Sequence, residues 1–202
     1  MYLLFCSLFK SRICLILSSI KLEELLDNRK FWEIGLVLHQ IRNLTIIKEI
    51  KKRLKGKVVI VCIGNELKGD DGAGPALAKF LEGDVKADVI NCEEVPEIYT
   101  DKIKELKPDT IIIVDAVDVK EKAGSVVLID KNKLEGERIY TTHNIPLKVF
   151  VDYLSSETKA NVFIIGIQPL SLELGKGLSK EVRKTLKYLK DIFIELLKEI
   201  NS

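Results

Sequence analysis

Acidic side chains and a histidine follow three apolar segments of this 202-residue chain. Asp70 and Asp71 lie in the glycine-rich segment GNELKGDDGAGP, Asp115 lies in IIIVDAVD, and His143 lies in TTHNIPL. Carboxylates and a neutral imidazole form a mixed oxygen and nitrogen ligand set that suits a borderline divalent ion. Two of the carboxylates and the histidine could therefore meet around one metal ion.

Each of these residues also has a purely structural interpretation. Asp70 or Asp71 could cap the helix that follows, because a carboxylate there accepts backbone N–H groups and complements the helix dipole. A single Asp at a strand end is often a loop residue, and a single histidine is more often structural than a ligand. Their convergence favours the metal site, since His143 is the only histidine in the part of the chain that alternates strands and helices.

Short apolar runs alternate with helical segments from Lys57 onward. The runs predict strands at 58–63, 87–92, 110–116, 125–130 and 161–167, and helices near 73–82, 98–106, 146–154 and 180–200. This order predicts an α/β fold, a three-layer sandwich around a mainly parallel five-stranded sheet of the phosphorylase/hydrolase-like kind. The short link from the third strand to the fourth also allows an antiparallel pair. In such sheets the site lies beyond the carboxyl ends of the strands, where the acidic residues fall.

The first 55 residues have a different, helical pattern. We expect residues 1–55 to form an N-terminal helical extension and residues 56–202 the α/β domain, with the segment before about Leu44 outside the catalytic core. Met1 is the only methionine, so part of this extension could be an artefact of start-site assignment. Lys10 and Arg12 split the apolar residues 1–20 into runs too short to span a membrane, and no secretory signal pattern follows.

Composition excludes several classes of partner and site. The formal net charge is only +2, which argues against a nucleic-acid or polybasic membrane partner. The four cysteines include no C-x-x-C pair, so reduced thiols in a cytoplasmic protein fit best. Cys62 and Cys92 lie in or beside apolar strands and are expected to be small buried hydrophobic residues. The oligomeric state does not follow from the sequence.

Other ligands of the glycine-rich segment fit less well. Its spacing is not G-x-G-x-x-G, and aspartates at the start of a phosphate-binding helix would repel a pyrophosphate. The chain has neither a Walker G-K-S/T nor a G-x-S-x-G elbow. A cofactor-binding oxidoreductase therefore remains only as an interpretation based on fold.

Five segments in this order, GNELKGDDGAGP, VPE, IIIVDAVD, TTHNIPL and IIGIQP, resemble the hydrogenase maturation endopeptidases, particularly the branch that serves formate-hydrogenlyase-type nickel-iron hydrogenases. The resemblance runs from about Lys57 to about Leu197. It implies an α/β sandwich and a protease of aspartic or metal-dependent type. The implied partner is a nickel-iron hydrogenase large-subunit precursor, which loses its C-terminal extension after nickel insertion.

The same resemblance implies that Asp71, Asp115 and His143 are the catalytic and metal-contacting triad. The implied metal is nickel carried by the substrate, with zinc or another divalent ion as an alternative in vitro. Two mechanisms stay open: a metal polarises the scissile carbonyl while a carboxylate takes a proton from water, or the triad docks on the nickel of the precursor as a readiness check. The alternative function is a non-catalytic metal-binding or chaperone-like factor that docks on the precursor.

Three further polar residues have open roles. Asp118 either orients a metal ligand or water, or caps the turn after Val117. Asn65 either offers its amide to a peptide or holds its own turn, and the turn is slightly favoured. Gln168 lies at the end of the last strand and receives no assigned role.

Overall fold

The structure is a computed structural model that describes residues 45–131, 134 and 147–200. Ile46–Ser202 form one compact unit. The described elements after an initial helix over residues 45–53 are β1 (Val58–Ile63), η2 (Gly69–Gly72), α3 (Ala73–Leu81), β2 (Asp88–Glu93), η3 (Pro96–Tyr99), α4 (Thr100–Glu105), β3 (Thr110–Ala116), β4 (Val126–Asp130), α5 (Leu147–Thr158), β5 (Asn161–Ile167) and α6 (Lys180–Ile200).

The strands form a five-stranded sheet in the order β2-β1-β3-β5-β4. β1 pairs in parallel with β2 and β3, and β3 pairs in parallel with β5. β4 is the antiparallel strand, and it pairs with β5 on the edge of the sheet. The chain therefore moves from β1 outward to β2 and then returns to the other side of β1 as β3. That reversal creates a topological switch point between the carboxyl ends of β1 and β3.

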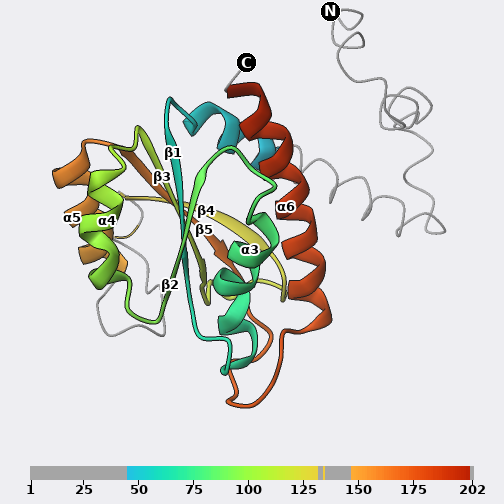
Figure 1. Cartoon of the computed structure of the whole chain (residues 1–202). Helices are drawn as coiled ribbons and strands as arrows, with labels where there is room; N and C mark the ends of the chain where they lie inside the picture. Colours follow the sequence, from blue (N-terminus) through green and yellow to red (C-terminus); the bar gives the residue numbers. More distant parts are fainter. Residues whose placement is uncertain (1–44, 132–133, 135–146, 201–202) are drawn as a thin grey trace, which may run out of the picture. The chain divides into compact units, whose positions relative to one another are not determined.

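Helices cover both faces of the sheet. Figure 1 shows α3 and α6 on one face and α4 and α5 on the other. β1 and β3 are buried along their whole length, as expected for central strands with helices on both sides. The predicted α/β three-layer sandwich with a mainly parallel sheet is confirmed.

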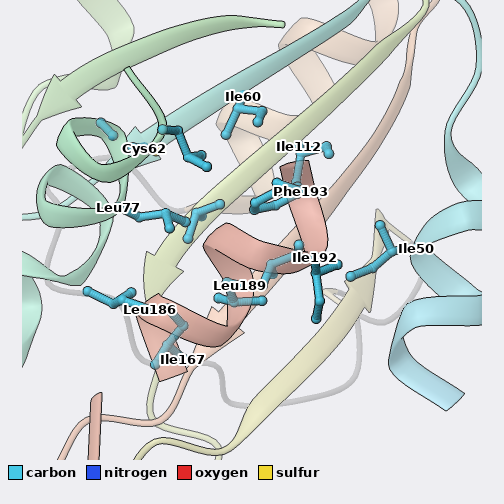
Figure 2. Close-up of a cluster of buried hydrophobic side chains, with 14 of the residues drawn as sticks. Ile50, Ile60, Cys62, Leu77, Ile112, Ile167, Leu186, Leu189, Ile192 and Phe193 are labelled. Atoms are coloured by element: carbon cyan, nitrogen blue, oxygen red, sulfur yellow. The ribbon is translucent and has the colours of Figure 1, made fainter. Parts of the chain in front are cut away.

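The larger apolar cluster lies between the sheet and the α3–α6 layer. In Figure 2, Ile60, Cys62 and Ile112 extend from the sheet toward Leu189 and Phe193 of α6. The apolar residues of α6 recur three and four positions apart along the helix, so one stripe faces the sheet. Its buried members are Val182, Leu186, Leu189, Ile192, Phe193, Leu196 and Leu197.

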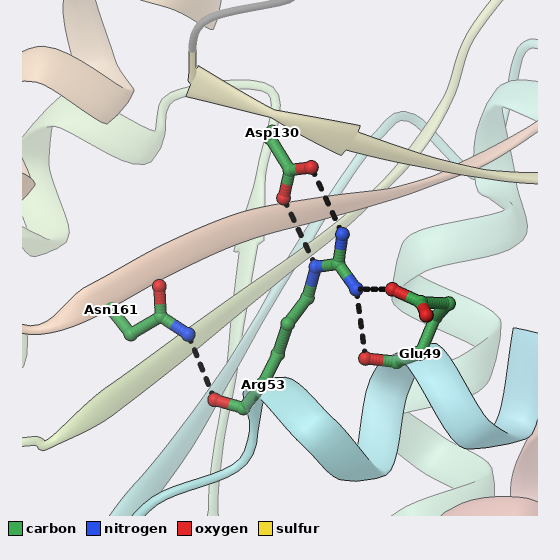
Figure 3. Close-up of polar contacts among 4 residues, drawn as sticks. All are labelled: Glu49, Arg53, Asp130 and Asn161. Carbon is green, nitrogen blue, oxygen red and sulfur yellow. Dashed lines mark hydrogen bonds and ion pairs between the residues drawn. The ribbon is translucent and has the colours of Figure 1, made fainter.

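The helix over residues 45–53 packs with this same core. Ile50 is fully buried, and Leu54, which follows the helix, is 8% exposed. Arg53 makes a two-point contact with the carboxylate of Asp130, at 3.0 Å from Nε and 2.9 Å from Nη2, and also binds Glu49 (Figure 3). These two carboxylates raise the pKa of Arg53, and the hydrogen bond from Arg53 lowers the pKa of Glu49. Residues 46–54 of the expected extension thus belong to the packed unit, whereas a separate extension over residues 1–44 stays a prediction outside the described residues.

The predicted strands match the observed ones to within one residue at each end, and two helices differ in extent. The expected helix at 98–106 is divided into η3 and α4, because Pro96 begins a separate 3₁₀ turn. Helix α5 continues to Thr158, past the expected end near residue 154. Among the described residues, none of the helices combines the length and apolar character that crossing a membrane requires.

Cys62 and Cys92 are free and buried. Burial raises the pKa of Cys92 to about 12 and also raises the pKa of Cys62. Both side chains are therefore neutral thiols near pH 7 and behave as small hydrophobic residues, as the sequence predicts.

Candidate functional site

Asp71 lies in the 3₁₀ turn η2, between the end of β1 and the start of α3. Its side chain is fully buried, and its Oδ2 accepts the backbone N–H of Asn65 at 3.0 Å. The backbone N–H of Asp71 donates to the carbonyl of Lys68 at 3.1 Å. Hydrogen bonds of both the backbone and the side chain of Asp71 therefore fix its position in the turn.

Two glycines allow the turn to approach β1 so closely. Gly64 has a φ of +143°, and a Cβ atom added there would lie 1.9 Å from the carbonyl oxygen of Asp71. A Cβ added to Gly74, at the start of α3, would lie 2.1 Å from the carbonyl oxygen of Ile63. Any side chain at either position would displace the turn from the strand, so the two glycines allow Asp71 to lie where it does.

Asp115 is the second buried carboxylate at this edge of the sheet. It is fully buried near the carboxyl end of β3, where it pairs with Gly166 of β5. The strand β3 and the turn η2 are in contact. Asp71 and Asp115 therefore lie on two contacting elements at the switch point, where α/β folds place their ligands.

His143 lies outside the described residues. Among the described residues, which do not include His143, no three His, Cys, Asp or Glu side chains are grouped so that they could hold a metal ion. The triad of Asp71, Asp115 and His143 accordingly stays a prediction, of which the structure describes two members.

Asp70 has a different role from its neighbour. Its carboxylate is 1% exposed and accepts N–H groups from Ser179 at 2.6 Å and Leu170 at 2.8 Å, with a longer contact to Ser171 at 3.4 Å. Neither η2 nor α3 has a side-chain cap. The helix-capping interpretation of Asp70 and Asp71 is therefore wrong: Asp70 anchors the loop between β5 and α6 instead.

Gln168 organises the connection from β3 to β4, a role that the sequence left open. Its Oε1 accepts the N–H groups of Val119 at 2.9 Å and Glu121 at 3.2 Å, and its Nε2 donates to Asp118 Oδ1 at 3.1 Å. Only its place at the end of β5, before a proline, could have suggested this function.

Asp118 and Asn65 make the turn contacts that their structural interpretations predict. Asp118 Oδ1 accepts the N–H of Lys120 at 3.1 Å, and the hydrogen bond from the Lys120 side chain is the main cause that lowers the pKa of Asp118. Asn65 Oδ1 accepts the N–H of Leu67 at 2.7 Å, an Asx turn. Asp118 as an indirect support of a ligand stays a prediction.

A surface pocket of about 760 Å³ lies at the opposite edge of the sheet, away from the buried carboxylates. Lysines and the ends of the neighbouring elements line it, among them Lys52, Lys55, Lys159 and Asn161. This edge carries the amino ends of the parallel strands, where the switch-point rule places no ligand. The edge with Asp71 and Asp115 is therefore the candidate site.

The fold is an α/β sandwich with two buried carboxylates at the switch point of its sheet. The family model described as hydrogenase maturation protease matches residues 74–196. The chain belongs to the hydrogenase maturation protease family, and it is a peptidase.

Individual relatives agree with this assignment. The hydrogenase 3 maturation protease of Escherichia coli K12 is 38% identical over 113 residues, which cover 55% of this chain and 72% of the relative. A Methanocaldococcus jannaschii protein named for the same family is 34% identical over 154 residues, which cover 71% of this chain and 90% of the relative. The crystal structure of a [NiFe] hydrogenase maturation protease, HycI, from Thermococcus kodakarensis aligns with a TM-score of 0.67 and 34% identity, covering 74% of this chain and 98% of that one.

Proposed function

We propose that this chain is an endopeptidase that removes the C-terminal extension of a nickel-iron hydrogenase large-subunit precursor after nickel has been inserted. The observation that carries the proposal is the pair Asp71 and Asp115, two buried carboxylates at the switch point of a protease fold. Burying a carboxylate costs free energy that hydrogen bonds or a bound cation must offset, and buried carboxylates at a switch point are candidates for metal binding or proton transfer.

The donor set fits nickel as the metal of the substrate. Asp71, Asp115 and His143 would supply two carboxylates and one imidazole, a set that suits a borderline divalent ion and leaves positions open for the precursor's own ligands. A bound divalent ion supplies positive charge that polarises a peptide carbonyl. Zinc or another divalent ion is an alternative occupant in vitro.

Asp71 is our candidate for the group that contacts the nickel or accepts a proton from the attacking water. The N–H of Asn65 binds Oδ2 of Asp71 and so fixes the orientation of the carboxylate. A fixed carboxylate loses no rotational freedom when the substrate arrives, which favours proton transfer in the transition state. This role would make the enzyme a protease of aspartic or metal-dependent type.

We place the reaction in the cytoplasm. The free, buried thiols of Cys62 and Cys92 support this assignment, because reduced cysteines are usual in that compartment.

The test presents the purified full chain with the large-subunit precursor, once with nickel inserted and once without. C-terminal shortening is followed by mass spectrometry. We expect a single cut in the nickel-loaded precursor and none in the nickel-free one. Binding of the loaded precursor without any mass loss would instead favour the alternative, a non-catalytic maturation factor.

A further inference from the structure

Four exposed leucines lie on the two segments that surround the buried aspartates. Leu67 is 67% exposed in the turn after β1, and Leu170, Leu172 and Leu174 are 63%, 38% and 75% exposed in the loop between β5 and α6. We call these four residues the leucine surface. Single exposed leucines are ordinary, but several on adjoining segments beside a functional site mark an interaction surface.

Backbone hydrogen bonds join the two segments. The N–H of Gly175 donates to the carbonyl of Leu67 at 2.8 Å, and the N–H of Gly69 donates to the carbonyl of Lys176 at 2.9 Å. Figure 1 shows the loop before α6 beside the turn before α3, at the bottom of the view. Leu67 and the loop leucines therefore belong to one continuous structure, and Asp71 lies in the same turn.

Buried groups hold this structure in place. Asp70 accepts N–H groups from both ends of the loop, at Leu170 and Ser179. A Cβ atom added to Gly69, whose φ is +56°, would lie 2.5 Å from the carbonyl oxygen of Ser171. The leucine surface is thus preformed, and a partner would bind it with little loss of loop entropy.

The charged groups around the leucines are engaged with one another. Lys176 pairs with Glu173 at 2.7 Å, and Lys68 pairs with Glu94 at 2.6 Å. Lys79 pairs with Glu66 at 2.7 Å. Each pair joins one lysine to one glutamate, so these six groups add no net charge to the surface, and apolar contact is the main source of affinity that the leucines offer.

We infer that the leucine surface binds an apolar stretch of the precursor polypeptide next to the scissile bond, with at least two large aliphatic or aromatic side chains. This inference rests on the proposed function. Leu67 and Asp71 lie in the same turn, and the loop that carries the other three leucines is hydrogen-bonded to that turn, so the leucine surface is continuous with the site. Apolar side chains of the precursor would then position the bond, while the carboxylates act on it.

The test compares the full chain with the double variant Leu67→Ser/Leu174→Ser, using nickel-loaded precursor as the substrate. Both leucines are largely exposed, so the variant is expected to unfold within about 2 °C of the unaltered chain. Losing two apolar contacts should raise KM by about tenfold or more, with kcat within about twofold. Leu67→Met/Leu174→Met keeps the apolar area and should retain the original KM. Val149→Ser, which removes an apolar residue 55% exposed on α5, is the matched control and should also retain it.

The possible outcomes separate this inference from the proposed function. If the unaltered chain does not cleave the loaded precursor, the proposed function fails. If it cleaves and the serine variant keeps the original KM, the leucine surface does not bind the precursor. Two further measurements complete the test: sedimentation of the full chain, and its flotation with neutral and anionic vesicles. If the full chain forms a dimer or a vesicle complex that the serine variant loses, and KM is unchanged, the surface binds a second copy or a lipid. That result would overturn the inference.

Discussion

Asp70 and Ser179 are joined by a 2.6 Å hydrogen bond from the backbone N–H of Ser179 to Oδ1 of Asp70, although 109 residues separate them in the sequence. Ser179 in turn accepts the N–H of Val182 and so caps α6. The first aspartate of the DD pair therefore connects the glycine-rich turn to the start of the last helix. Its neighbour, Asp71, makes none of these contacts with the loop and is the candidate site residue.

Replacing Asp70 should destabilise the fold. Asp70→Ala leaves the N–H groups of Leu170 and Ser179 buried without their carboxylate, and we expect a loss of about 3 kcal/mol in the free energy of unfolding. Asp101→Ala removes an Asp whose side chain is 83% exposed and should cost less than about 0.5 kcal/mol. Urea unfolding of both variants measures the difference. Equal stabilities would show that the loop is held by other contacts.

Gly64 should tolerate no side chain. Gly64→Ala combines a positive φ with a Cβ atom 1.9 Å from the carbonyl of Asp71, so we expect a loss of about 2–4 kcal/mol and a displaced Asp71. Gly83 also has a positive φ, +76°, but has nothing within 4 Å of its added Cβ. Gly83→Ala should therefore show only the backbone cost, about 1 kcal/mol. Thermal unfolding compares the two variants, and a Gly64→Ala no worse than Gly83→Ala would contradict the close approach.

The start of the packed unit can be tested by shortening the chain. A chain that begins near Asn43 keeps Ile50, Leu54 and the Arg53–Asp130 contact, and it should fold and retain activity. A chain that begins at Gly56 loses two buried aliphatic side chains and should be less stable by about 3–5 kcal/mol. Chemical denaturation of the two shortened chains provides the measurement. An inactive or insoluble chain from Asn43 would place earlier residues in the catalytic core.

The strands and the fold class could be predicted because central strands buried on both faces are continuous apolar runs. VVIVCI and TIIIVDA are such runs, and both are fully buried in β1 and β3. The strand that pairs with β4 could not be predicted from the sequence, because the short link between β3 and β4 does not determine which strand lies beside β4. In the structure β4 crosses to the far side of β5.

The roles of Asp70 and Gln168 could not be predicted, since both depend on contacts between segments far apart in the chain. Asp70 binds a loop about one hundred residues later, and Gln168 binds backbone groups at Val119 and Glu121. A local sequence pattern can predict that an Asp caps the next helix, but it cannot predict a contact with a loop that is distant in the sequence. Asp71 and Asp115 could be selected because their elements end at the same edge, a property of parallel sheets.

The proposed metal contact predicts that His143 contributes to nickel binding. Calorimetric titration of nickel, and separately of zinc, into the unaltered chain and His143→Ala should show weaker binding by the variant, because the imidazole ligand is gone. Equal, measurable affinity in both would exclude a shared site. Negligible affinity in both would favour a metal that arrives with the precursor.

The proposed mechanism requires the Asp71 carboxylate in cleavage. The most direct test measures, by mass spectrometry, the rate at which Asp71→Asn shortens the nickel-loaded precursor. Asp71→Asn keeps the side-chain volume and an acceptor for the N–H of Asn65, so folding should survive. The rate should fall by about 10² to 10⁴, the usual cost of losing a general base, and Asp71→Glu should lose less because it keeps the charge. Asp101→Asn, at an exposed position, is the control and should cleave at the original rate. A folded Asp71→Asn that also cleaves at the original rate would contradict the account, because the carboxylate would then be only a structural group of the turn.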